Sequence, residues 1–227
     1  MRGQLLARIP TTKIGREQEA SELIEVGVQM APERGTGRLV GFAAYASAVL
    51  DNGLGRYDAV RRAFERDQLA LGPLVVAELA EAAARTGDVE AVRAALDWLS
   101  ARTRVTHTEW VLGIEARVRA LLSEGEAAEC CYRESVERLG RTRVRAELAR
   151  SHLLYGEWLR RQGRRVDARK QLRAAHLMLE EMGMEAFAER ARRELRATGE
   201  TARKRTAAAS EVLTAQEAQV ADRKSVV

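Results

Sequence analysis

The sequence has few aromatic residues and few prolines. Aromatic side chains make up 4% of the 227 residues, and there are only 3 prolines. Clusters of β-branched residues are also scarce, whereas alanine, leucine, arginine and glutamate are abundant. Because strands favour β-branched and aromatic residues and helices favour the abundant types, the composition predicts an all-α protein. Hydrophobic residues reach 46%, which is enough for a sizeable core.

Cysteine and long apolar runs are scarce as well. The 2 cysteines, Cys130 and Cys131, are adjacent, and neighbours on a helix point about 100° apart, so they cannot close an ordinary disulfide. We interpret them as helix-packing residues. No run approaches the roughly 20 apolar residues of a membrane span, and residues 1–10 lack the apolar centre of a signal peptide. These absences predict a cytoplasmic protein without a membrane partner.

Motifs that carry catalysis are missing too. The histidines, His107, His152 and His176, have no neighbour at metal-ligand spacing. There is no GxxxxGK[ST] phosphate loop and no nucleophile–base arrangement. The sequence therefore predicts no catalysis, no metal site and no cofactor.

The charges lean towards the basic side. The net charge is +5, which is typical of a solvated helical surface and only weakly predicts a partner. Four arginines surround Gly163, and they are Arg160, Arg161, Arg164 and Arg165. They are candidates for contact with an anion, such as DNA phosphate or an acidic protein surface. The alternative, which we favour, is an ordinary charged turn balanced by Glu157 and Asp167.

Small and apolar residues recur at regular steps along residues 152–175. The expected helix-packing positions are Gly156, Leu159, Gly163, Ala168, Leu172 and Ala175. Small side chains let two helices approach closely, and a glycine ends a helix at little steric cost. The spacing resembles the consensus of a tetratricopeptide repeat, whose period is about 34 residues.

The same pattern returns earlier in the chain. The positions equivalent to Ala168 are Val60, Val92 and Ala128, and Asp88 follows a predicted turn, where it is expected to cap a helix. The intervals between Val60, Val92, Ala128 and Ala168 scatter around the tetratricopeptide period. Residues 16–199 are therefore predicted to form a tetratricopeptide-like solenoid of helical hairpins. Its last helix, Met184–Ala197, is expected to be a cap with charges on its outer side: Glu189, Arg190, Arg193 and Glu194.

The ends of the chain differ from this array. Residues 1–15 are expected to be a lead-in and residues 200–212 a basic linker. Residues 213–221 have the start signals of another helix: Thr214 and Glu217 form a capping-box pattern, and Leu213 can pack onto the following turn towards Val220. Residues 222–227 are expected to be a non-native tail.

Several segments resemble the C-terminal region of LuxR-family large ATP-binding regulators related to MalT. The most specific are GIEARVRALLSEGEAAE, YRESVERLGRTRVRAELARSHLLYGEWLRR, MEAFAERARRELRATGETARKRT and LTAQEAQVA. The resemblance extends over most of the chain from about Gly15. In that family a nucleotide-hydrolysing domain precedes helical repeats, and a DNA-binding helix-turn-helix domain follows them.

This sequence departs from the family at both ends. The phosphate loop is absent, and the sequence after LTAQEAQVA lacks the recognition helix that would touch base edges. We therefore expect a fragment of a LuxR-family regulator, whose repeats sense a protein or small-molecule inducer for a DNA-binding domain that is missing here. The alternatives are a stand-alone repeat scaffold that binds a peptide or helix in its groove, and a helical accessory region of an enzyme.

Overall fold

The described part of the chain consists of helices. The structure is a computed structural model that describes residues 14–29, 37–66 and 72–199, and these ranges contain no strand, so the all-α prediction is confirmed for them. None of their helices is long and apolar enough to cross a lipid bilayer. The helices are α2 (Ile14–Gln29), α3 (Gly37–Leu54), α4 (Tyr57–Arg66), α5 (Pro73–Thr86), α6 (Val89–Thr106), α7 (Glu109–Leu122), α8 (Gly125–Gly140), α9 (Arg145–Arg161), α10 (Arg165–Glu181) and α11 (Glu185–Ala197).

Tight glycine turns join many of these helices. Gly87, Gly163 and Gly183 have φ of 78°, 76° and 69°, the left-handed conformation that glycine adopts without steric cost. The amide after each glycine donates to a carbonyl in the last turn of the preceding helix, at 2.9, 3.0 and 2.8 Å, which satisfies the helix end. Asp88 then caps α6, because its Oδ1 accepts from the Ala91 amide at 3.0 Å. This confirms the predicted cap.

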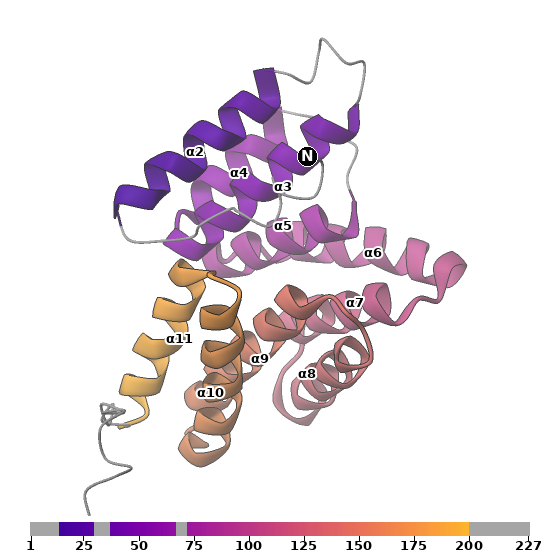
Figure 1. Cartoon of the computed structure of the whole chain (residues 1–227). Coiled ribbons are helices and arrows are strands. Elements are labelled where there is room, and N and C mark those ends of the chain that lie inside the picture. The colour runs from indigo at the N-terminus through magenta and orange to yellow at the C-terminus, as the bar shows by residue number, and fades with distance from the viewer. Residues whose placement is uncertain (1–13, 30–36, 67–71, 200–227) are drawn as a thin grey trace, which may run out of the picture.

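Consecutive helices pack side by side, and alternate helices also meet. In addition to its sequence neighbours, α5 contacts α3 and α7, and α11 contacts α3. Figure 1 shows α5 and α6 crossing between the N-terminal helices above and α7 to α11 below. The contact between α11 and α3 brings the last described helix back to the N-terminal part. The inner helices α3, α5, α7, α9 and α11 thereby surround a common interior.

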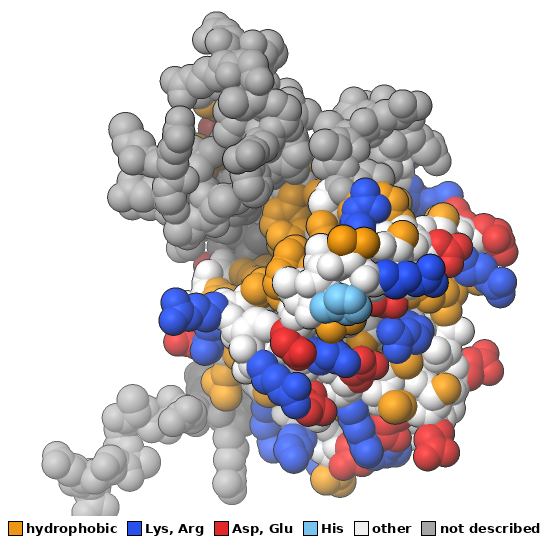
Figure 2. Space-filling model, turned by 90° about the vertical axis from the view of Figure 1, so that its right-hand side faces the viewer, with side chains coloured by type: hydrophobic (Ala, Val, Ile, Leu, Met, Phe, Trp, Pro, Cys, Tyr) orange, Lys and Arg blue, Asp and Glu red, His pale blue; other side chains and the backbone are white. Residues whose placement is uncertain are grey.

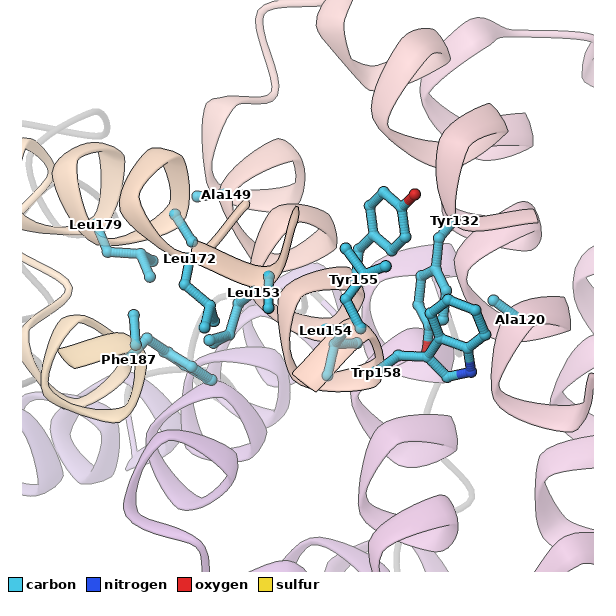
Figure 3. Packing of buried hydrophobic residues seen from close by; sticks show 14 of the residues in the cluster. Ala120, Tyr132, Ala149, Leu153, Leu154, Tyr155, Trp158, Leu172, Leu179 and Phe187 are labelled. Carbon is cyan, nitrogen blue, oxygen red and sulfur yellow. The ribbon is translucent and has the colours of Figure 1, made fainter. Parts of the chain in front are cut away.

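Two large apolar clusters fill the space between the hairpins. One joins α5, α6, α7 and α8. The other joins α7 to α11 and Val49 of α3, and it contains the leucines and aromatic rings of Figure 3. In it the rings of Tyr132 and Tyr155 stack with centroids 5.5 Å apart, and Trp158 lies 5.9 Å from Tyr132. Tyr155 and Trp158 are therefore buried in the packing of this region.

Candidate functional site

The predicted packing positions lie where α9 crosses α10. Gly156 faces Leu172 so closely that a Cβ on the glycine would lie 2.6 Å from the leucine Cγ. Gly163 forms the turn, and the remaining positions are fully buried, each at 0% exposure: Leu159, Ala168, Leu172 and Ala175. Their counterparts Val60, Val92 and Ala128 are also buried. The spacing therefore marks residues at which helices approach one another.

The predicted helix-turn-helix start lies outside the described residues. This applies to Leu213, Thr214, Glu217 and Val220, to the linker and to the tail. At the other end, α2 begins at Ile14, two residues before the predicted start of the repeat domain.

The four arginines around Gly163 are only partly neutralised. Arg160 pairs with Glu194 of α11, and Arg164 pairs with Asp167 and Glu129. Arg161 and Arg165 are exposed, and neither has an ion pair with any residue of the described ranges. The predicted balancing role of Asp167 is therefore right. The same role for Glu157 is wrong, because that carboxylate points into the interior and is 2% exposed.

Four glutamates and four arginines meet in the interior between the inner helices. This interior ion network consists of Glu78, Glu81 and Arg85 from α5, Arg117 from α7, Glu147, Arg150 and Glu157 from α9, and Arg190 from α11. All but Arg85 are more than nine-tenths buried. Removing a charge from water costs several kcal/mol, so these residues are tolerated in the interior because acids and bases pair there.

Arg150 lies at the centre of the network. Its guanidinium binds both oxygens of Glu78, at 2.9 and 3.1 Å, and also pairs with Glu81. Its other face covers the ring of Phe187 at 4.0 Å from the centroid. Asn52 of α3 donates to Glu78 Oε2 at 2.7 Å. The pair of Arg150 and Glu78 thus connects four helices, α3, α5, α9 and α11.

Arg190 ties α11 to this centre. Its Nη1 lies 2.7 Å from Glu81 Oε1, and its Nε and Nη2 lie 2.6 and 2.9 Å from the two oxygens of Glu157. Arg85 also pairs with Glu157. The prediction that Arg190 lies on the outer side of a capping helix is wrong, because α11 packs against α3 and the inner helices and so has a second buried side. Glu194 is likewise engaged, in an ion pair with Arg160.

A second branch connects α7, α9 and α3. Arg117 pairs with the Glu147 carboxylate, and its Nη1 donates to the Glu147 carbonyl at 3.0 Å. The Tyr45 hydroxyl of α3 donates to the same carboxylate at 3.2 Å. Ser151 accepts from Arg117 at 3.4 Å and shares a hydrogen bond of 2.8 Å with Ser135. Each inner helix from α3 to α11 therefore contributes to one set of buried polar contacts.

Burial and neighbouring charges compete in setting the pKa values of these glutamates. For Glu78, burial helped by the two nearest glutamates outweighs Arg150 and raises the pKa above its ordinary value. For Glu81 and Glu157, burial acts in the same direction, but the arginine partners outweigh it and lower the pKa. Among these three, Glu78 is therefore the carboxylate that takes up a proton most readily as pH falls.

The other candidate groups have ordinary structural roles. His152 Nδ1 lies 2.7 Å from Gln171 Oε1, and burial lowers the pKa of this histidine. Cys131 is buried and Cys130 exposed, and both are free thiols. In the described ranges no group of three or more acidic, histidine or cysteine side chains has the arrangement of a metal site.

Comparisons with protein-family models, curated proteins and solved structures find no match to this chain. The interior ion network is mostly buried and links the first inner helix to the last. Its chemistry suits mechanical coupling between helices.

The sequence of helix α5 carries a signal for this network, separate from the repeat-packing positions. The helix is rich in alanine and valine, and its only charged residues are Glu78, Glu81 and Arg85. These positions are three and four residues apart, so they lie along one side of the helix. A charged stripe on an otherwise apolar helix favours burial with partners over exposure.

Proposed function

We propose that this chain is the sensing module of a LuxR-family large ATP-binding regulator. Its hairpins would form a tetratricopeptide-like solenoid whose surface receives a protein or small-molecule inducer. DNA binding would belong to a C-terminal helix-turn-helix domain, of which only the opening residues 213–221 are in the sequence. The observation that carries the proposal is the set of ion pairs between Arg190 and the carboxylates of Glu81 and Glu157.

These pairs give the module a means of transmitting a signal. An inducer that changes the spacing of α5 and α9 would have to stretch or break the contacts of Arg190. Buried ion pairs tolerate such stretching poorly, because a separated partner becomes an uncompensated charge in the interior. The array would therefore switch between discrete arrangements. Because α11 directly precedes the basic linker, its movement would reach the DNA-binding domain.

The second candidate function is that of a stand-alone scaffold. The buried ion pairs argue against a scaffold that binds its partner along the inner helices. In such a scaffold a peptide or helix would lie along the inner helices. Here the inner side of α5 and α9 is already occupied by paired side chains of the same chain, including Glu78 and Arg150, which are 0% and 1% exposed. A peptide would have to displace these pairs.

The first test is the coding sequence on both sides of this chain. The proposal expects a phosphate loop upstream of codon 1 and a complete helix-turn-helix downstream of codon 221. A natural stop codon after Val227 in independently cloned DNA would contradict it.

The second test uses that full-length gene with a transcription reporter. We expect Arg190→Met to alter induction, either by fixing the reporter in one state or by raising the inducer concentration required. Arg192→Met is the matched control, because Arg192 lies on the same helix but pairs at the surface with Glu189. Equal responses from both variants would remove Arg190 from the signalling route.

A further inference from the structure

One end of the last hairpin carries exposed cations without acidic partners. The end of α9, the start of α10 and the end of α11 lie together there, because Arg169 donates to the Thr198 carbonyl at 2.7 Å and Arg160 pairs with Glu194. This surface, the basic end, is formed by exposed side chains that make no ion pair within the described ranges: Arg161, Arg165, Lys170, Arg193 and Arg196.

Charge is separated along this hairpin. The carboxylates of Glu180, Glu181 and Glu185 lie at its opposite end, near the turn between α10 and α11, where Glu181 pairs with Arg145 at the start of α9. By contrast, the face on the right of Figure 1, where α6, α7 and α8 lie, has blue and red side chains interspersed in Figure 2. Like charges gathered at one end repel one another and produce a local positive potential. An anionic partner would relieve that repulsion.

We propose that the basic end binds the phosphate backbone of duplex DNA without reading its sequence. Duplex DNA carries one negative charge per about 1.7 Å of its axis, so a broad cationic surface meets several phosphates at once. Arg165 and Lys170 are five residues apart, about 7.5 Å along α10. Arg193 and Arg196 supply a second pair of cations on α11. Such a surface needs no pocket, because phosphate contacts fix position and leave base edges unread.

The surroundings of the basic end favour duplex DNA over other anionic partners. Stable protein interfaces usually centre on aromatic or aliphatic anchors in pockets. Near the basic end, the only large hydrophobic side chain exposed in the described ranges is Val166, at 76%. Binding of single strands relies on aromatic side chains that stack with bases. No aromatic residue of the described ranges is among the exposed large hydrophobics.

The position of the basic end in the chain also favours duplex DNA as its partner. The helix α11 ends there, at the lower left of Figure 1, and the sequence continues with Arg203, Lys204 and Arg205. The inference rests on the proposed function to the extent that a DNA-binding domain follows α11. A surface beside that domain would then add affinity without adding sequence specificity.

The test measures binding of a fluorescent 20-base-pair duplex by anisotropy, with the full chain, between 25 and 200 mM NaCl. If about four phosphates are contacted, log K should fall with log [salt] at a slope near −3.6. The test variant carries R165Q, K170Q, R193Q and R196Q. We expect it to lose at least about tenfold in affinity at 50 mM salt, with a slope reduced by about 2 or more.

The matched control removes the same number of exposed charges from other parts of the surface. It carries R62Q, R93Q, R104Q and R143Q. We expect the control to stay within about twofold of the unmodified chain, because nonspecific affinity follows phosphate contacts and not net charge alone. Equal losses in both variants would overturn the proposal. Circular dichroism and melting temperature verify that each variant is folded.

Two further arms test other sources of binding. Loss of binding in R203Q/K204Q/R205Q, with full retention in the test variant, would place the contact in the linker and overturn the proposal. Equally tight binding of poly-glutamate, at the same charge concentration, would point to an acidic protein partner and also overturn it. Failure in these assays leaves the reporter comparison of Arg190→Met and Arg192→Met unaffected, so the two proposals can fail separately.

Discussion

Replacing Arg190 with methionine tests whether the interior ion network holds α11 in place. The change keeps an unbranched, flexible side chain but removes three charged contacts of 2.6 to 2.9 Å. Breaking a buried ion pair by removing one partner costs about 3–5 kcal/mol. Arg85 still pairs with Glu157 and Arg150 with Glu81, so we expect the lower end, about 3 kcal/mol. For a chain of this size that corresponds to a melting temperature about 6–12 °C lower.

Urea denaturation followed by circular dichroism at pH 7.5 measures this loss. Arg192→Met is the control on the same helix: Arg192 and its partner Glu189 are 45% and 43% exposed, and exposed pairs contribute at most about 1 kcal/mol. If Arg190→Met loses no more free energy of unfolding than Arg192→Met, the network does not hold α11 and the role assigned to Arg190 is wrong.

The same variant has a predicted pH dependence. Arg190 is the strongest of the groups that lower the pKa of Glu157 against its burial. A lowered carboxylate pKa stabilises the native state above the unfolded value of about 4.3, and that contribution is lost as pH falls through the folded pKa. Without Arg190 the pKa of Glu157 is lowered less, so this carboxylate contributes less to the stability of the native state. The stability difference between the unmodified chain and the variant should therefore be largest near pH 7.5 and should narrow towards pH 4. A constant difference would contradict the assigned cause.

Two further predictions concern packing and protonation. Gly156→Ala places a methyl group 2.6 Å from the facing leucine, so we expect a loss of about 1–3 kcal/mol. Gly140→Ala, which meets no atom within 4 Å, should show no such loss in the same urea titration. Burial lowers the pKa of His152, so the native state holds fewer protons than the unfolded state and becomes less stable as pH falls below about 6.5. His152→Gln should flatten that part of the stability profile, and an unchanged slope would exclude His152 as its source.

Local sequence patterns predict much of the helical arrangement. A glycine in such a pattern can either end a helix or permit another helix to pack closely against it. At Gly163 the glycine ends a helix with φ of 76°, as predicted. Gly53 and Gly55 stand close together and predict a helix break at Gly53, but this prediction is wrong, because α3 continues to Leu54. A Cβ at Gly53 would lie 3.0 Å from Ala186 Cβ and 3.1 Å from Phe187 Cε2. This glycine permits the close approach of α11, a contact that the sequence around it does not reveal.

The interior ion network also depends on contacts between distant parts of the chain, which local sequence patterns do not predict. Its pairs join residues that are 72 and 109 positions apart, as in Arg150–Glu78 and Arg190–Glu81. The first pair forms only when α9 packs against α5, and the second only when α11 returns to the N-terminal helices. Periodicity identifies the face of a helix on which a charge lies, but not whether another helix covers that face. Arg190 and Arg193 are three residues apart on α11, yet the first is 6% exposed and the second lies on the surface.

Because these two arginines share one short helix, the two proposals make a joint prediction. If Arg190 fixes the position of α11, its loss should also disturb the alignment of Arg193 and Arg196 with the cations of α10. We expect Arg190→Met to bind the 20-base-pair duplex several-fold more weakly at 50 mM salt, although no exposed cation has been removed. Gly113→Ala is the control, because its Cβ would lie 2.7 Å from Leu139 Cγ in the α7–α8 hairpin, far along the chain from α11. It should lower stability by about 1–3 kcal/mol without changing duplex affinity. Equal weakening in both variants would mean that the effect follows overall stability and is not transmitted by α11.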